Sequence, residues 1–292
     1  MHLSIARRWA VAAVCFLAGV APLAARWLPD DRAIVACGVA LTVALAALTL
    51  AIRRRGVLRD LWPLALAFTT FALVQVLNNT LPGYVGTQVL RDPPTSGDPL
   101  ASTIPGTVVV QLLDTAIAVV PIVLLTRLTG QSLGSIYGRI GRRTGWLALS
   151  ALAFVAFYAI TLLGPGRSTQ LIPTSALSTE RVLGLTPVLL VLVISNPLQE
   201  ELLFRGLFLR KYVALFGVQG AVVLQALVFC VAHVGVTYSP VALLFAFAVA
   251  FPLGLICGSL MYASDGLLAP LLFHAGADIP IYLAFVASVS SS

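Results

Sequence analysis

Hydrophobic residues occur along this chain in nine blocks, separated by short breaks that are rich in Arg, Gly and Pro. A helix needs about 20 apolar residues to cross the hydrocarbon core of a bilayer, and most blocks are close to that length. The blocks lie at 9–28, 33–52, 61–78, 107–126, 146–163, 183–209, 218–236, 241–262 and 267–289. The pattern therefore predicts an all-α, polytopic transmembrane helical bundle of eight or nine spans.

The first block has a second interpretation, as a secretory signal peptide. Arg7 and Arg8 precede it and small residues occur near Ala25, which is the arrangement of a cleavable leader. However, the block is long for a leader, and another apolar block follows it at once. We therefore favour a membrane span and keep the leader as the alternative.

The composition supports a membrane protein and excludes several other classes. Hydrophobic residues make up 59% of the chain and charged residues 10%, with a mean hydropathy of +1.00. Soluble globular proteins are typically about 45–50% apolar and about 25% charged. These differences exclude a soluble enzyme, a disordered protein and a secreted disulfide scaffold. The net charge of +7 does not indicate nucleic-acid binding here, because basic residues in membrane proteins mark the cytoplasmic loops.

The distribution of basic residues predicts which side of the membrane each loop faces. With a cytoplasmic N-terminus, 13 of the 18 basic residues fall on the cytoplasmic side and 5 on the other side. The positive-inside rule favours this orientation. The turn-rich segments 80–106 and 164–181 are then external loops.

Polar chemistry is unevenly distributed, which suggests a division of the chain. The four spans within 1–126 have few ionisable residues, and their role is not indicated. A basic cytoplasmic loop follows at 127–145, and the spans within 146–289 contain most of the ionisable groups. We expect the functional core in this last region.

Ionisable side chains inside a bilayer are costly, roughly 3 kcal/mol each at the helix centre on insertion scales, so each one is a candidate for function. Two pairs are spaced i, i+4, which places both members on one helix face: Glu201 with Arg205, and His274 with Asp278. Pro197 lacks a backbone donor, so we expect a kink just before these residues. Apart from Arg26 near the end of the first block, the acidic, basic and histidine residues within predicted spans are Asp114, Glu200, Glu201, Arg205, His233, His274 and Asp278.

Three motifs on separate predicted helices resemble the CAAX-protease and bacteriocin-processing (CPBP) family of intramembrane glutamic endopeptidases. Each motif alone is weak, but their order and their placement on helices are specific, and the likeness covers roughly 146–289. In chain order the motifs are Glu200-Glu201-x-x-x-Arg205, Phe229-x-x-x-His233 and His274-x-x-x-Asp278.

The resemblance implies proteolysis inside the membrane without a metal or other cofactor. By analogy with the family, Glu200 is the general base that deprotonates water, and His233 helps to hold that water. His274, together with Asp278, stabilises the oxyanion of the tetrahedral intermediate. This assignment is chemically coherent, because hydrogen-bond donors act more strongly in a dry site than in water.

The resemblance also implies a supporting ion pair between Glu201 and Arg205. One position departs from a common form of the family motif, which has Asn where this chain has Asp278. An amide can donate a hydrogen bond to an oxyanion, whereas an ionised carboxylate only accepts. Two roles of Asp278 are therefore open: it orients His274, or it stays protonated.

The resemblance further implies a peptide or membrane-protein substrate, lipidated in CAAX-type processing, or a role in bacteriocin processing and immunity. The lipid bilayer is the other expected partner, and no nucleic acid is expected. The implied location is a multi-pass position in a bacterial-type cytoplasmic membrane.

Two other functions compete with this one. A zinc protease with Glu200, His233 and His274 as ligands has an accepted ligand set, although the chain lacks a His-Glu-x-x-His helix. A non-catalytic immunity or scaffold protein, or a transporter that uses Asp114, is the other alternative. The absence of a visible inverted repeat counts against a transporter.

Overall fold

The structure, a computed structural model, describes residues 5–86, 103–163, 178–234 and 240–289. Most of the two predicted external loops lies outside these residues. The α-helices are α1 (Ile5–Ala24), α2 (Asp31–Arg54), α3 (Trp62–Tyr84), α4 (Ile104–Leu128), α5 (Thr144–Leu163), α6 (Thr179–Glu200), α7 (Leu209–Ala232), α8 (Pro240–Phe245), α9 (Phe251–Ser264) and α10 (Leu268–Val289).

Nine helical segments among the described residues are long and apolar enough to cross a membrane, which confirms the prediction from the hydrophobic blocks. The described part of the chain contains helices and no strand. One span combines α8 and α9 through a π-helical turn at Ala246–Ala250. The chain is thus an all-α, multi-pass membrane protein. The side of the membrane that its N-terminus faces stays a prediction.

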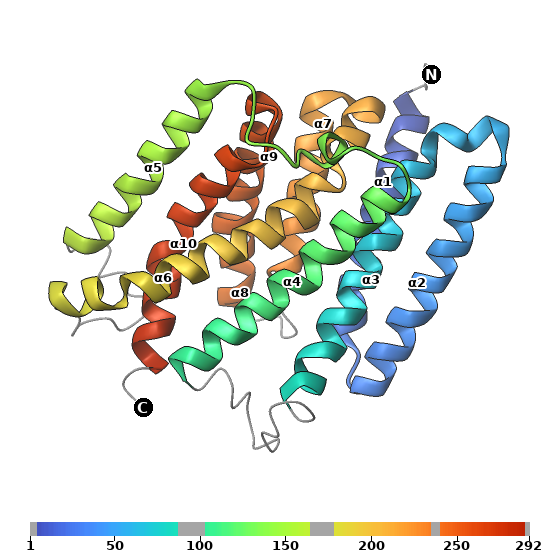
Figure 1. Ribbon diagram of the computed structural model, residues 1–292. Coiled ribbons are helices and arrows are strands. Elements are labelled where there is room, and N and C mark those ends of the chain that lie inside the picture. The colour runs from blue at the N-terminus through green and yellow to red at the C-terminus, as the bar shows by residue number, and fades with distance from the viewer. Residues whose placement is uncertain (1–4, 87–102, 164–177, 235–239, 290–292) are drawn as a thin grey trace.

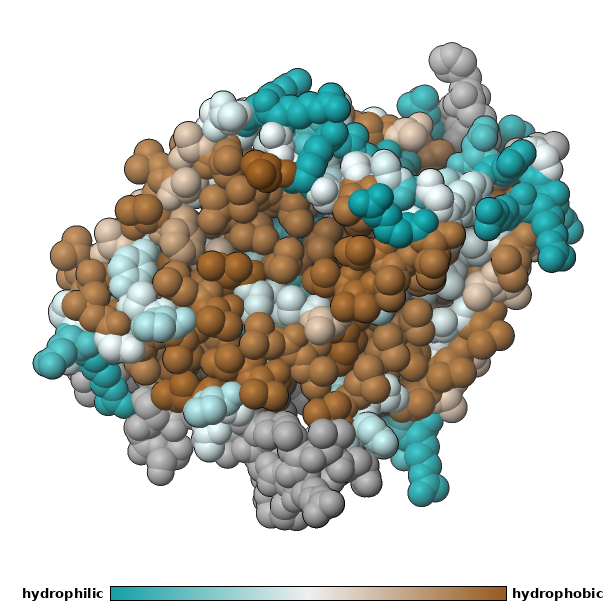
Figure 2. Space-filling model, viewed as in Figure 1, coloured by the Kyte–Doolittle hydropathy of each residue, from teal (hydrophilic) through white to brown (hydrophobic). Residues whose placement is uncertain are grey.

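The molecular surface agrees with this assignment. Figure 2 shows a broad hydrophobic band across the molecule, with hydrophilic side chains gathered mainly along its upper edge and at the lower corners. Large apolar side chains of the spans are well exposed, among them Val43 of α2, Leu152 of α5 and Leu244 of α8. An apolar surface of this extent is stable in lipid and not in water.

The helices form a bundle in which the N-terminal spans pack directly on the C-terminal ones (Figure 1). α10 packs against α5, α6 and α9, while α4 packs against α6. α1 lies against α3 and α7, and α2 packs on α3 at one edge of the bundle. Aromatic rings join the two halves: Phe71 of α3 contacts Phe204 with centroids 5.6 Å apart, and Phe204 contacts Phe229 at 5.1 Å.

The backbone is irregular just after Pro197, where the sequence predicts a kink. α6 continues to Glu200, and a π-helical turn follows at Glu201–Gly206, in which the Leu207 amide donates to the Leu202 carbonyl. Proline removes one helical hydrogen bond, and π-helical turns occur frequently at functional sites. Consecutive residues of a helix point about 100° apart, and here Glu200 ends α6 whereas Glu201 begins the π-helical turn.

α7 contains a second irregularity at Gly217, whose φ of 74° lies in the left-handed region. Glycine adopts this conformation without the steric cost of a Cβ atom. The residue separates a short first part of α7 from the part that begins at Val218, which is the start predicted for this span. The longer part leads to His233.

The basic loop 127–145 is docked on the bundle. Ile136 and Tyr137 are buried, and Arg139 forms an ion pair with Asp265 in the turn between α9 and α10. A Cβ atom on Gly266 would lie 2.4 Å from the Gly141 Cα, so two glycines are needed for this close approach. The loop therefore fixes the position at which α10 starts.

Candidate active site

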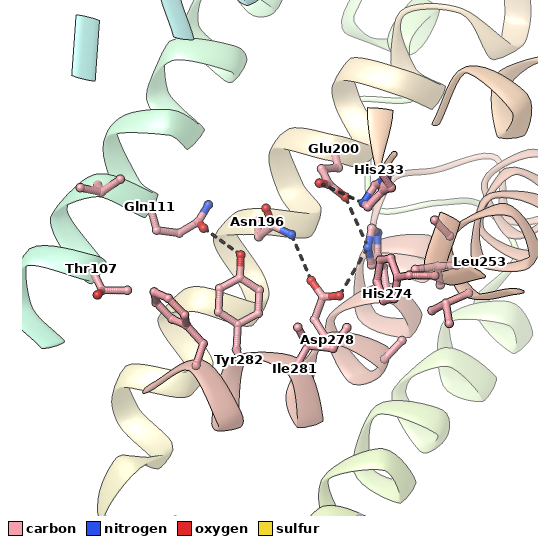
Figure 3. Close-up of a pocket in the computed structure, with 16 residues that line it drawn as sticks. Thr107, Gln111, Asn196, Glu200, His233, Leu253, His274, Asp278, Ile281 and Tyr282 are labelled. Atoms are coloured by element: carbon pink, nitrogen blue, oxygen red, sulfur yellow. Dashed lines mark hydrogen bonds and ion pairs between the residues drawn. The ribbon is translucent and has the colours of Figure 1, made fainter. Parts of the chain in front are cut away.

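Four of the predicted catalytic side chains line one cavity of about 480 Å³ within the bundle. Figure 3 shows Glu200, His233, His274 and Asp278 converging from α6, the end of α7, and α10. Half of the residues around the cavity are apolar. Its full lining is Thr107, Val110, Gln111, Asn196, Glu200, His233, Phe245, Val249, Ala250, Leu253, His274, Ala277, Asp278, Ile281, Tyr282 and Phe285.

Glu200 lies between two imidazole rings. Its Oε2 is 3.5 Å from His274 Nε2, and its Oε1 is 4.0 Å from His233 Nε2. Oε2 is buried and receives no hydrogen bond from the described residues. A carboxylate oxygen in this situation is well placed to accept a hydrogen bond from water, which is what a general base needs.

His233 is positioned by the end of α7. Its Nδ1 is 2.8 Å from the carbonyl oxygen of Phe229, one turn earlier, and its ring packs on the Phe229 ring at 4.4 Å. A carbonyl oxygen only accepts, so Nδ1 carries the proton of this hydrogen bond. The Nε2 atom of the neutral ring is therefore an acceptor that faces Glu200.

His274 is almost fully buried and is held by a second acid. Its Nδ1 donates to Glu201 Oε1 at 2.8 Å, while its Nε2 lies 3.7 Å from Asp278 Oδ1. A hydrogen bond to one ring nitrogen fixes the orientation of the ring and the role of the other nitrogen. Nε2 of His274 is thus directed into the cavity, between Glu200 and Asp278.

Glu201 and Arg205 form an ion pair that is entirely inaccessible to solvent, with Arg205 Nη1 3.2 Å from Glu201 Oε1. The guanidinium also lies 4.0 Å over the Phe229 ring. Glu201 therefore contacts both a permanent cation and His274. It belongs to the support of the site and does not line the cavity, in contrast to its neighbour Glu200.

The structure adds residues that the sequence analysis did not identify. Asn196 donates from Nδ2 to Asp278 Oδ2 at 3.1 Å, and the Tyr282 hydroxyl donates to Gln111 Oε1 at 2.9 Å (Figure 3). Asn196 lies one turn before Glu200 on α6, so its i, i+4 spacing could have identified it. Gln111 gave no comparable indication, because only the packing of α4 on α6 brings it to the cavity.

The site geometry bears on the zinc alternative. Among the described residues, one group of three potential ligands lies within 4.8 Å, and it is Glu201, Cys257 and His274. Zinc–ligand distances are about 2.0–2.3 Å, so an ion there would lie close to the Arg205 guanidinium that already contacts Glu201. This adjacent positive charge makes the group a poor zinc site.

Taken together, the fold and the cavity define a membrane-embedded helical protein with a carboxylate and two imidazoles at an intramembrane cavity. Residues 182–280 match the family model described as "Type II CAAX prenyl endopeptidase Rce1-like". This segment is Rce1-like, which confirms the resemblance to the CPBP family and supports a membrane protease, a hydrolase. The match includes all six predicted site residues. No curated protein and no solved structure matches the chain.

Proposed function

We propose that the chain is an intramembrane endopeptidase in which Glu200 activates water without a metal ion. The observation that carries this proposal is the position of Glu200, whose carboxylate lies within 4.0 Å of two imidazoles at the wall of an intramembrane cavity. Its buried Oε2 has no hydrogen-bond donor among the described residues. The Rce1-like segment contains all six predicted site residues and supports the same class of enzyme.

In the first chemical step, Glu200 takes a proton from a water molecule while the water oxygen attacks the carbonyl carbon of the peptide bond. The new C–O bond forms as the carbonyl π electrons move to oxygen, which gives a tetrahedral oxyanion. His233 accepts a hydrogen bond from the same water through Nε2 and so holds it in line. General-base catalysis of this kind typically contributes about 10²–10⁴-fold to the rate.

His274 stabilises the oxyanion in this proposal. As an imidazolium it donates through Nδ1 to Glu201 and through Nε2 to the oxyanion, so both protons are used. When the intermediate collapses, the C–N bond breaks and the leaving amine takes the proton that Glu200 received. A pre-oriented donor of this type is worth about 10²–10³-fold in kcat.

Asp278 has a positioning role here, because an ionised carboxylate cannot donate to an oxyanion. It accepts a hydrogen bond from Asn196 and lies 3.7 Å from His274 Nε2. The amide of Asn196 is a neutral donor in the lining of the cavity, one turn before Glu200. We assign to Asn196 the hydrogen bond to the oxyanion that an Asn at position 278 would donate beside His274.

The substrate in this proposal is a membrane-associated peptide or protein, including lipidated peptides of the CAAX type. Apolar side chains of α8, α10 and the π-helical turn between α8 and α9 form one wall of the cavity, and Val249, Ile281 and Phe285 among them are also exposed on the surface that faces lipid. A peptide attached to the bilayer therefore reaches Glu200 from the membrane. Within the predicted division of the chain, 146–289 is the catalytic core.

The test is cleavage of a quenched fluorogenic peptide library, with lipidated members, by purified protein and by Glu200→Gln. Glu180→Gln is the matched control, because Glu180 is exposed at the start of the same helix. We expect Glu200→Gln to lose at least about 10²-fold in activity and Glu180→Gln to retain it.

Each enzyme is assayed with and without a chelator. Activity that is lost with chelator would replace the glutamic mechanism with the zinc alternative. Equal activity of Glu200→Gln and wild type would contradict the role of Glu200. If the wild type cleaves no peptide, a non-catalytic immunity or scaffold role becomes the better reading.

A further inference from the structure

A second cavity, of about 270 Å³, reaches Glu200 from the side of the N-terminal spans. Residues of α3 and α4 and of the short helical turn after α1 form it together with the end of α6 and the end of α7. Its lining is Leu23, Arg26, Gln75, Asn78, Asn79, Asp114, Gln199, Glu200, Leu203, Phe204, Ala232 and His233.

Glu200 and His233 are the two residues that line both this cavity and the candidate active-site cavity. The two side chains therefore separate the candidate active-site cavity from the second cavity. On α4 the two cavities are lined by successive turns of the same helix face, with Gln111 at the first cavity and Asp114 at the second. A molecule in the second cavity reaches the Glu200 carboxylate without passing the substrate wall.

The second cavity has the polarity of a water-filled space. Eight of its twelve lining residues are polar or charged, compared with eight of sixteen for the first. Two buried oxygen atoms of residues on its wall, Asn78 Oδ1 and Gln199 Oε1, receive no hydrogen bond from the described residues, and neither does Oε2 of Glu200, a residue shared by the two cavities. Buried acceptors are usually satisfied, and in a polar cavity the donor is ordered water.

The cavity also extends to the protein surface. Arg26 and Asn79 at one end are exposed, whereas Glu200 and His233 at the other end are only partly accessible. The C-terminal end of α3, the helix that contributes Asn78 and Asn79 to the lining, lies toward the lower edge of the bundle in Figure 1. A water molecule takes up about 30 Å³, so the space holds several molecules in a row.

We propose that this second cavity is the aqueous path that delivers the hydrolytic water to Glu200. The use of the water rests on the proposed function, whereas the hydration of the cavity does not. Peptide and water then arrive by separate routes, the peptide from lipid and the water through the N-terminal spans. This assigns a function to α1, α3 and α4, which lie outside the Rce1-like segment.

Cysteine labelling tests the path without requiring protease activity. A methanethiosulfonate with a quaternary ammonium group reacts with thiolates that water reaches, and burial among apolar groups suppresses the thiolate. Asn78→Cys is compared with Val74→Cys, one turn away on α3 and fully buried. Asp114→Cys is compared with Ala118→Cys, its counterpart on α4 that is also buried. The background variant replaces Cys37, the exposed native cysteine.

We expect both cavity cysteines to react at least about 100-fold faster than their buried partners, since a thiol pKa raised by two units lowers the thiolate fraction by that factor. Two variants on different helices keep the test informative if one of them does not fold. Equal rates within both pairs, or no reaction at either cavity position, would overturn the proposal.

The second measurement connects the path to catalysis. Complete modification of Asn78→Cys fills the second cavity and leaves the substrate cavity open, so we expect kcat to fall at least about tenfold while KM is unchanged. Unchanged kcat in the fully modified protein would overturn water delivery. An unmodified wild type without any activity, combined with fast labelling, would contradict the proposed function and leave the hydration of the cavity supported.

Discussion

Removal of the Arg205 guanidinium tests how the buried ion pair supports the site. In Arg205→Met a long apolar side chain replaces the cation, and Glu201 is left as an uncompensated acid with no solvent access. At 3.2 Å and an effective dielectric constant near 20, the lost attraction is roughly 5 kcal/mol. Breaking a buried pair from one side typically costs about 3–5 kcal/mol.

The contacts of the guanidinium support a loss of this size. The Arg205 nitrogens make no aligned hydrogen bond to the described residues, so the attraction to Glu201 is electrostatic. The Phe229 ring under the guanidinium adds a cation–π interaction of about 1–2 kcal/mol. We therefore expect Arg205→Met to lower the free energy of unfolding by about 3–5 kcal/mol.

The measurement is a reversible SDS-unfolding titration in mixed micelles, followed by circular dichroism. Glu201→Gln and the double variant Glu201→Gln/Arg205→Met complete a double-mutant cycle. The double variant buries no charge at these positions, so we expect it to be more stable than the sum of the single effects predicts, by about 2 kcal/mol or more. The exposed ion pair of Arg142 with Asp265 is the control, and Arg142→Met should cost less than about 1 kcal/mol.

Additive effects of the two single variants, within about 0.5 kcal/mol, would refute the reasoning, because independent residues give additive free energies. An effect of Arg205→Met as small as that of Arg142→Met would refute it as well. In either case the Glu201–Arg205 contact would not have the electrostatic weight that its burial implies.

Three further predictions concern the loop and the site. Burial alone would raise the pKa of Asp265, but hydrogen bonds from two arginines outweigh it and lower the pKa below the ordinary value of 3.8. Ionised Asp265 therefore stabilises the fold above about pH 4, and this contribution is lost as pH falls through the folded-state pKa. In Asp265→Asn the free energy of unfolding should consequently change less between neutral and acid pH than in the wild type. Gly266→Ala should lower the free energy of unfolding in the SDS titration by at least about 2 kcal/mol, because its Cβ would meet the Gly141 backbone. Gly184→Ala has open space around its Cβ and should leave this free energy unchanged. Asn196→Leu should lower kcat by about tenfold or more in the peptide assay with little change in KM, since it removes a donor next to the reacting carbonyl; an unchanged kcat would contradict that role.

The sequence predicts the fold well because a bilayer imposes a simple rule. Each span needs about 20 apolar residues with satisfied backbone hydrogen bonds, so length and hydropathy are enough to locate helices. The nine blocks correspond to nine helical segments among the described residues. The hydrophobic pattern also places a break before Val218, where the structure has the left-handed Gly217.

The candidate site was predictable to the extent that its residues are charged. Glu200, His233 and His274 are conspicuous because ionisable groups are rare in apolar helices. Neutral polar residues on other helices, such as Gln111 on α4, do not stand out in the same way, since amides and hydroxyls occur throughout the spans. Their contribution depends on which helix faces meet, and that information is in the packing and not in the local pattern.

The adjacent acids show why local pattern and packing have to be combined. Glu200 and Glu201 are chemically identical and neighbours in sequence, yet one lines a cavity and the other is fully enclosed with Arg205 and His274. Consecutive residues of a helix point about 100° apart, so the two acids face different neighbours. A carboxylate that is to accept a proton from water must reach water, and one that is to hold an imidazolium must be kept from it. The division of roles between the two acids therefore follows from the neighbours that each one faces, and the N-terminal spans that wall the second cavity provide the access that Glu200 requires.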